Sequence, residues 1–246
     1  MTNKPKNLPT RKFSDSQRKK WRQNIFDIYR RMKEKSKNGV FEVRFGKIFL
    51  SVLPNVYDPV AFTDTLWFAK QIQKIVGKKS LLEIGTGSGA IAVSAALNGA
   101  KVVATDINPD AVKNARLNTK KTKTKVDVRQ GNLYEPIGKN EKFDFIFWAH
   151  PFNNWGTPVS NMLLRSGLDY KYKGLRGYIA GAKKHLNSGG KLLLGTGDSA
   201  DLKTIAEEAK KNGYSLKLLK KITMPLEKKG KAKITDLLYE FVANKK

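Results

Sequence analysis

The chain has 246 residues, which suits one large domain or one domain with an extension. Its 40% hydrophobic content is enough for a sizeable core, and its lack of cysteine excludes disulfides, thiolate metal sites and a cysteine nucleophile. No apolar run approaches ~18 residues and residues 1–10 are polar, so neither a membrane-spanning helix nor a secretory signal is expected. The two histidines are far apart in sequence, so no histidine-built metal centre is expected.

Positive charge dominates the composition. Lys and Arg number 48 against 21 acidic residues, which gives a formal net charge of +27. A globular chain this basic attracts polyanions, so we expect a cytoplasmic protein that contacts RNA. The alternative explanation of the charge is a lysine-rich genome or a hot or high-salt habitat.

The basic residues gather in three segments. Residues 1–39 are expected to form a tail and an amphipathic helix, because Ser14 and Gln17 have the spacing of a capping box. After them apolar residues recur at helical intervals and basic residues occupy the other faces: Trp21, Ile25, Ile28 and Met32 against Arg18, Lys19, Arg22, Arg30 and Arg31. Seven lysines and one glutamate lie between Lys217 and Lys233, and a third concentration lies between Lys113 and Lys125. Each basic face either is solvated or lies on RNA phosphates.

Residues 40–246 are expected to form one α/β domain. The alternation in residues 40–53 predicts a β-hairpin, and a helix is expected from Phe62 to Gly77. A core at 80–200 follows, with strands at 81–84, 101–105, 126–129, 143–148 and 191–195 and helices at 90–97, 109–117 and 175–186. A strand pair at 215–243, with strands at 215–222 and 234–242, completes the domain. The alternation of strands and helices predicts a parallel sheet covered on both faces.

A glycine-rich turn follows the first strand of this core. In Glu83-Ile84-Gly85-Thr86-Gly87-Ser88-Gly89 a buried strand runs into a turn and then a helix. Glycine permits positive φ and the close approach of a ligand, and a helix N-terminus offers free N–H groups. The next strand ends at Asp106, 21 residues after Gly85, where a carboxylate can accept both hydroxyls of a ribose.

Two cofactors fit this turn. Gly85, Gly87 and Ala90 satisfy the dinucleotide pattern G-x-G-x-x-G/A, whereas Gly89 produces G-x-G-x-G. S-adenosylmethionine is favoured over a nicotinamide dinucleotide, because Glu83 suits a cofactor with an ammonium and a sulfonium and suits a pyrophosphate badly. After this core we also expect no second domain of the size that a dehydrogenase needs.

The segments 83–92 and 102–112 resemble the cofactor motifs of class I S-adenosylmethionine-dependent methyltransferases. The likeness is strongest to the group of release-factor glutamine N5-methyltransferases and small-subunit ribosomal RNA guanine N2-methyltransferases, and it extends over roughly residues 40–242. It implies a Rossmann-like seven-stranded sheet with one antiparallel strand near the end. It also implies cofactor contacts for the amino-acid moiety from Glu83, Gly85, Thr86, Gly87, Ser88 and Gly89, for the ribose from Asp106, and for the adenine from Ile107, Asn132 and Leu133.

The same resemblance places the catalytic motif after the fourth strand, where relatives carry F-D-x-I-x-x-N-P-P-[FY]. Here Ala149 stands at the asparagine, His150 at the first proline, and Pro151 and Phe152 match. In the family the asparagine side chain and the next backbone carbonyl hold the target N–H, and the aromatic ring stacks on the planar target. The Ala149 side chain cannot make the asparagine's hydrogen bond to the target. Loss of one positioning hydrogen bond lowers the rate on the order of 10²-fold.

Three explanations of Ala149 are open. The first is that the position was engineered to alanine, and the intact cofactor motif favours this explanation. The second is that His150, Asn153 or Asn154 replaces the asparagine. The third is that the protein binds the cofactor without catalysis. Asp64 is either a helix cap or part of the segment that leads to the cofactor pocket.

The predicted function is N-methyl transfer to an exocyclic or amide nitrogen of structured rRNA or tRNA, without a metal. The N-terminal helix and the segment between Lys217 and Lys233 are the predicted RNA contacts. A glutamine amide of a translation factor is the alternative acceptor, and a non-catalytic RNA-binding module is a third function. A nicotinamide dehydrogenase is the least favoured alternative.

Overall fold

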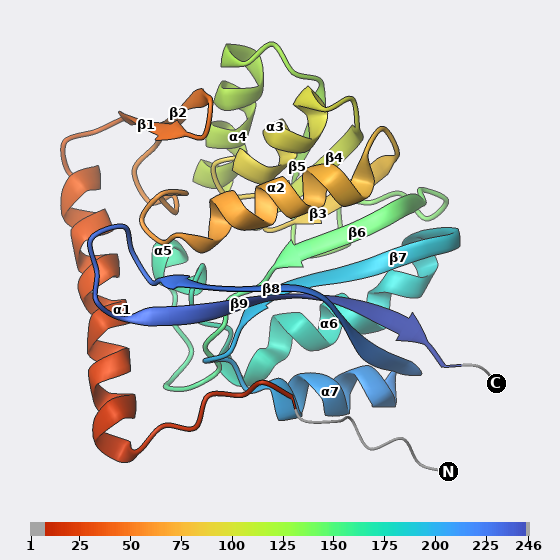
Figure 1. Cartoon of the computed structure of the whole chain (residues 1–246). Coiled ribbons are helices and arrows are strands. Elements are labelled where there is room, and N and C mark those ends of the chain that lie inside the picture. Colours follow the sequence, from red (N-terminus) through yellow and green to blue (C-terminus); the bar gives the residue numbers. More distant parts are fainter. Residues whose placement is uncertain (1–7, 245–246) are drawn as a thin grey trace.

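A seven-stranded sheet forms the centre of the computed structural model, which describes residues 8–244 (Figure 1). The strand order is β5-β4-β3-β6-β7-β9-β8. The strands are β3 (Ser80–Ile84), β4 (Lys101–Asp106), β5 (Val126–Gln130), β6 (Phe143–Ala149), β7 (Leu186–Gly197), β8 (Tyr214–Pro225) and β9 (Lys233–Ala243). Neighbours from β5 to β7 are parallel, and β9 runs antiparallel to both β7 and β8. The predicted α/β, Rossmann-like sheet with one antiparallel strand is therefore confirmed.

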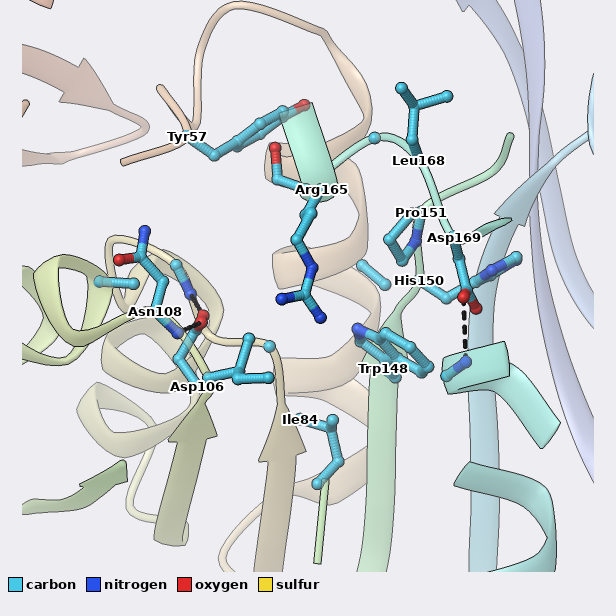
Figure 2. A pocket seen from close by; sticks show the side chains of 18 of the residues that line it. Tyr57, Ile84, Asp106, Asn108, Trp148, His150, Pro151, Arg165, Leu168 and Asp169 are labelled. Carbon is cyan, nitrogen blue, oxygen red and sulfur yellow. Dashed lines mark hydrogen bonds between the residues drawn. The ribbon is translucent and has the colours of Figure 1, made fainter. Parts of the chain in front are cut away.

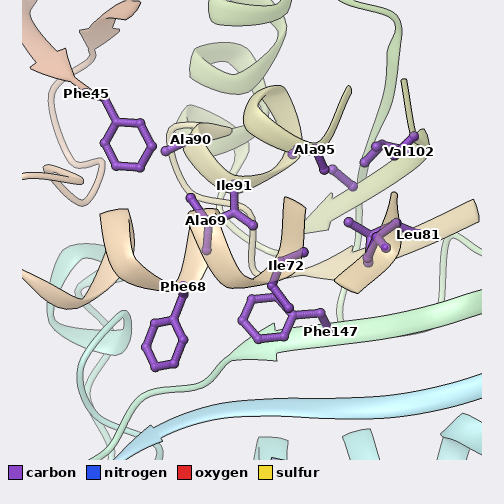
Figure 3. Packing of buried hydrophobic residues seen from close by; sticks show 14 of the residues in the cluster. Phe45, Phe68, Ala69, Ile72, Leu81, Ala90, Ile91, Ala95, Val102 and Phe147 are labelled. Atoms are coloured by element: carbon purple, nitrogen blue, oxygen red, sulfur yellow. The ribbon is translucent and has the colours of Figure 1, made fainter. Parts of the chain in front are cut away.

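Helices cover both faces of the sheet because its central strands are apolar on both sides. On one face lie α2 (Asp64–Val76), α3 (Ala90–Leu97) and α4 (Pro109–Lys121); on the other lie α6 (Lys173–Gly181) and α7 (Leu202–Lys211) (Figure 1). Figure 3 shows the first core, where Phe68 and Ile72 of α2 pack against Ile91 of α3 and Phe147 of β6. The β1 (Phe41–Phe45) and β2 (Ile48–Val52) hairpin extends this core through Phe45.

The basic N-terminal helix, α1 (Asp15–Ser36), is docked on the domain. Its predicted capping box is present, with Ser14 and Gln17 exchanging hydrogen bonds. Its apolar face buries Trp21, Ile25, Ile28, Tyr29 and Met32 against Leu163, Leu226 and Ile234. The basic side chains outside this face are mostly exposed.

Three helices differ from the sequence prediction. The helix expected at 175–186 is shorter, because α6 ends at Gly181, a 3-10 turn covers Ala182–His185 and Leu186 already belongs to β7. Helix α7 was not predicted; Asp201 caps it by accepting from the Thr204 N–H. A short helix α5 (Met162–Arg165) also interrupts the loop after β6.

Candidate active site

A cavity of about 1320 Å³ opens at the carboxyl ends of β3, β4 and β6. Parallel strands end at the same sheet edge, so segments far apart in sequence meet there. The cavity brings together nearly all the residues singled out from the sequence: Glu83, Gly85, Thr86, Gly87, Ser88, Asp106, Ile107, Asn132, Leu133, Ala149, His150, Pro151, Phe152 and Asn153. Gly89 lies just behind it, at the start of α3.

The glycine turn has the backbone geometry that its sequence predicts. Gly85, Gly87 and Gly89 have φ values of 64°, 57° and 81°. A Cβ on Gly85 would lie 2.7 Å from the indole nitrogen of Trp148, so this position has no room for a side chain. At Gly87 no atom lies within 4 Å of the position that a Cβ would occupy, so the Gly87 backbone is open to a ligand.

Glu83 is a buried acid at the end of β3. Its carboxylate accepts a hydrogen bond of 2.7 Å from the Thr86 hydroxyl. Burial raises the pKa of Glu83 to about 8, although the Thr86 hydrogen bond opposes this shift. A cationic group bound nearby would favour the ionised form.

Asp106 holds the turn from the neighbouring strand. Its carboxylate oxygens accept from the Gly87 N–H at 2.8 Å and from the Asn108 N–H at 2.9 Å (Figure 2). The cap of α4 is Asn108, which accepts from the Asp110 N–H, so Asp106 is not the helix cap. Burial raises the pKa of Asp106, and the positive charge of Arg165 opposes that shift.

The adenine-side residues lie beside Asp106 with different exposure. Ile107 is partly exposed at the cavity wall, and Leu133 adopts a φ of 51° and packs near Gly177. The Asn132 side chain is exposed and donates to Glu135 at 3.3 Å. The Asn132 amide nitrogen has a second N–H, which this contact leaves available to a ligand.

The motif at the end of β6 places Ala149 and Phe152 in the cavity but withdraws the His150 ring. His150 is buried, and its Nε2 lies 2.9 Å from the Thr196 hydroxyl. Burial lowers the pKa of His150 to about 3, so its imidazole is neutral at pH 7 and a weak base. This environment argues against the hypothesis that the His150 ring replaces the missing asparagine side chain.

The amides after the motif are engaged in holding the loop. Asn153 donates to the Gly167 carbonyl at 2.9 Å and accepts from the Trp155 indole at 3.1 Å. Asn154 donates to Asp201 at 3.4 Å. The Asn153 amide is therefore engaged at both ends, and Asn154 is not among the cavity-lining residues, so neither replaces the asparagine that Ala149 lacks.

A family model described as methyltransferase small domain matches residues 63–217. The chain belongs to the methyltransferase small domain family. A candidate protein N5-glutamine methyltransferase of Methanocaldococcus jannaschii is 29% identical over 189 residues, 73% of this chain and 91% of the archaeal protein. A release factor glutamine methyltransferase of Aquifex aeolicus is 28% identical over 193 residues, 74% of this chain and 65% of that enzyme.

Solved structures share the fold of this methyltransferase. A 16S rRNA N2-guanine methyltransferase of T. thermophilus, in complex with AdoMet and guanosine, has a TM-score of 0.56 at 18% identity, over 84% of this chain and 50% of that chain. A methyltransferase from Pyrococcus furiosus has a TM-score of 0.53 at 25% identity, over 75% of this chain and 86% of that chain. The family and the AdoMet-bound relative identify S-adenosylmethionine as the methyl donor, as predicted.

The residues present fit this donor. The open Gly87 backbone and the buried Glu83 carboxyl suit a ligand that carries an amino acid, and Asp106 suits its ribose. Within residues 8–244 no cluster of three His, Asp or Glu side chains could hold a metal. None of the helices described is long and apolar enough to cross a bilayer.

The sequence analysis missed several cavity residues of this methyltransferase. Tyr57 and Phe62 are stacked with centroids 5.9 Å apart and an interplanar angle of 3°. Arg165 extends into the cavity between Asp106 and Trp148 (Figure 2). Asp236 of β9 also lines the cavity. Of the two roles considered for Asp64 from the sequence, the structure places it in the cavity wall at the first position of α2, with Thr63 as the capping residue. Aromatic and acidic residues in loops and edge positions have no periodic pattern, so only the three-dimensional arrangement identifies them.

Proposed function

We propose that this methyltransferase methylates a nitrogen of structured RNA, with rRNA or tRNA as the substrate class. The observation that carries the proposal is the meeting of two basic segments, almost 200 residues apart in sequence, beside the cavity that both of them line. These segments are α1 and the turn between β8 and β9, which lie side by side in Figure 1.

Specific contacts join the two basic segments. Arg31 of α1 forms an ion pair of 2.6 Å with Glu227 in the β8–β9 turn. Leu226 of the same turn packs in the core below α1, and it lines the cavity together with Trp21. All seven lysines between Lys217 and Lys233 have exposed side chains. A polyanion that entered the cavity would therefore cross a cationic rim made from both segments.

The cavity wall supports a flat acceptor. The stacked pair Tyr57 and Phe62 is joined by Tyr29, whose ring lies 5.9 Å from that of Phe62. Phe152, next to Pro151, also lines the cavity. Unstacked RNA bases are commonly bound on aromatic rings of this kind.

The cofactor half of the cavity supports the remaining site assignments. S-adenosylmethionine bound here supplies a methyl group on a positively charged sulfur. Glu83 and the turn from Gly85 to Gly89 would hold its amino-acid moiety, Asp106 its ribose hydroxyls, and Ile107, Asn132 and Leu133 would surround the adenine. Phe152 would stack on the acceptor, and the backbone of His150 would hold its N–H. These contacts align the acceptor nitrogen with the methyl group, and such positioning supplies much of the rate.

A glutamine amide of a protein is the second candidate acceptor. The names of the M. jannaschii and A. aeolicus relatives favour it. An amide is also planar and would fit between the aromatic side chains.

Labelling separates the two acceptors. The full-length protein is incubated with tritiated methyl donor and total RNA or total protein, each with and without nuclease. We expect nuclease-sensitive label in RNA. Label that stays with protein after nuclease treatment would establish the second candidate instead.

A further inference from the structure

A buried carboxyl group without a partner lies on the acceptor side of the cavity. The Asp236 side chain is 0% exposed, and neither of its carboxyl oxygens has a hydrogen-bond partner within residues 8–244. Asp236 nevertheless lines the cavity. Burial of an unsatisfied carboxyl destabilises a fold, so a folding role does not explain this residue.

The sheet register places Asp236 near the methyltransferase motif. Ala149 pairs with Gly195, and two residues further along β7 Gly197 pairs with Asp236. Side chains two apart on a strand share a face, as do directly paired ones, so Asp236 and Ala149 are on the same face of the sheet. Gly197, which pairs with Asp236, has no side chain. The Phe152 ring lies 2.9 Å from the point that a Cβ on Gly197 would occupy.

Asp64 brings a second carboxyl group to this part of the cavity. It begins α2, and its Oδ1 accepts from the Thr65 N–H at 2.6 Å. Burial raises the pKa of Asp64 and of Asp236, and the negative charge of Asp64 raises the pKa of Asp236 further. The pair therefore retains a proton at a pH where two separate carboxyl groups would both be ionised.

We propose that Asp236, together with Asp64, accepts the N–H of the methyl acceptor in place of the asparagine side chain that Ala149 lacks. The inference rests on the proposed function and adds the acceptor-binding residue to it. The lone pair of the acceptor nitrogen forms the bond to the methyl carbon, the carbon–sulfur bond breaks with its electrons left on sulfur, and the nitrogen's proton passes to a carboxylate oxygen of the pair.

The other side chains near Ala149 do not serve this purpose. The His150 ring is withdrawn onto Thr196, and the Asn153 amide is held by Gly167 and Trp155. Of the three explanations for Ala149, the structure thus favours a different group in the asparagine's role, although not one of those predicted from sequence.

The test compares Asp236→Asn, Ala149→Asn and the double variant in the full chain. For Asp236→Asn we expect an unchanged or higher melting temperature, an S-adenosylhomocysteine Kd within about twofold of wild type, and methyl transfer to RNA reduced by about 10²-fold. In the Asp236→Asn background, Ala149→Asn should restore methyl transfer by at least about tenfold. Glu240→Gln is the matched control, because Glu240 also lies on β9 but its carboxylate pairs with Lys191 outside the cavity.

The outcomes separate the inference from the proposed function. Wild-type rates in Asp236→Asn would overturn the inference alone. A loss of transfer that Ala149→Asn does not restore, or a loss accompanied by a lower melting temperature and weaker S-adenosylhomocysteine binding, would also overturn it. A wild-type protein that labels no RNA would overturn the proposed function and the inference with it.

Discussion

The Thr86 hydroxyl donates a 2.7 Å hydrogen bond to the carboxylate of Glu83, which is only 3% exposed at the end of β3. Burial outweighs this hydrogen bond and raises the pKa of Glu83 to about 8. The ligand-free protein therefore carries a largely neutral Glu83 at pH 7. The ammonium of the cofactor, held by Glu83 as proposed, would pair with the ionised form, so binding would release a proton.

The affinity for S-adenosylhomocysteine is therefore expected to rise with pH. Between pH 6 and 8 the increase approaches about tenfold per pH unit, and it levels off above the pKa of Glu83, about 8. Calorimetry across this range measures it, and Glu83→Gln should flatten the dependence. An equal slope in both proteins would assign the proton to another group.

Gly85→Ala is expected to weaken cofactor binding. Its new Cβ would displace the Trp148 indole, and its φ of 64° also strains any side chain. Gly77→Ala is the matched control, because Gly77 also has a positive φ, 59°, but a Cβ on Gly77 would meet no atom within 4 Å. Gly77→Ala should lose about 1–2 kcal/mol of stability from its φ alone. Gly85→Ala should lose more, because its Cβ also meets Trp148, and only Gly85→Ala should lose S-adenosylhomocysteine affinity, by about tenfold or more. Equal affinities would show that Trp148 does not shape the site.

Helix α1 is expected to be necessary for both stability and activity, because its apolar face closes the cavity. Ile28 is 2% exposed, and Ile28→Ala should cost about 2–5 kcal/mol in chemical denaturation. Phe26, on the same helix, is 42% exposed, and Phe26→Ala should cost less than about 1.5 kcal/mol. Similar costs for the two would mean that α1 is not docked as described.

The charge of the β8–β9 turn is expected to control RNA binding. The double variant Lys228→Glu with Lys229→Glu should weaken RNA affinity and make its log–log salt dependence shallower by roughly 2, because up to two phosphate contacts are lost. The control is Lys120→Glu with Lys123→Glu, an equal charge change at the C-terminal end of α4, about 20 Å from the helix end that lies at the cavity. Filter-binding titrations that respond equally in both variants would show that only net charge matters.

The sequence predicted the parts of the fold that depend on local signals. The capping box at Ser14, the glycine turn and the alternation of strands and helices all have direct local causes. The predicted start of β7, at Lys191, was wrong, because Gly189 and Gly190 suggest a turn in the sequence. In the structure β7 begins at Leu186, and an irregular pairing with β6 near Phe143 accommodates both glycines within the strand.

The acceptor side of the site could not be predicted in the same way. Asp236 occupies an ordinary strand position, and its role arises from its register opposite Gly197. The contribution of α1 to the cavity depends on its packing against the β8–β9 turn, a contact between residues about 200 positions apart. Such long-range pairing leaves no mark in either segment alone.

The most direct test of the account is methyl transfer to total RNA by wild type and Asp106→Ala. Asp106 orders the glycine turn through Gly87 and is proposed to hold the cofactor ribose. The account predicts nuclease-sensitive label with the wild type and at least about 10²-fold less with the variant. Equal labelling by the two proteins would contradict the account, because the cofactor would then bind elsewhere.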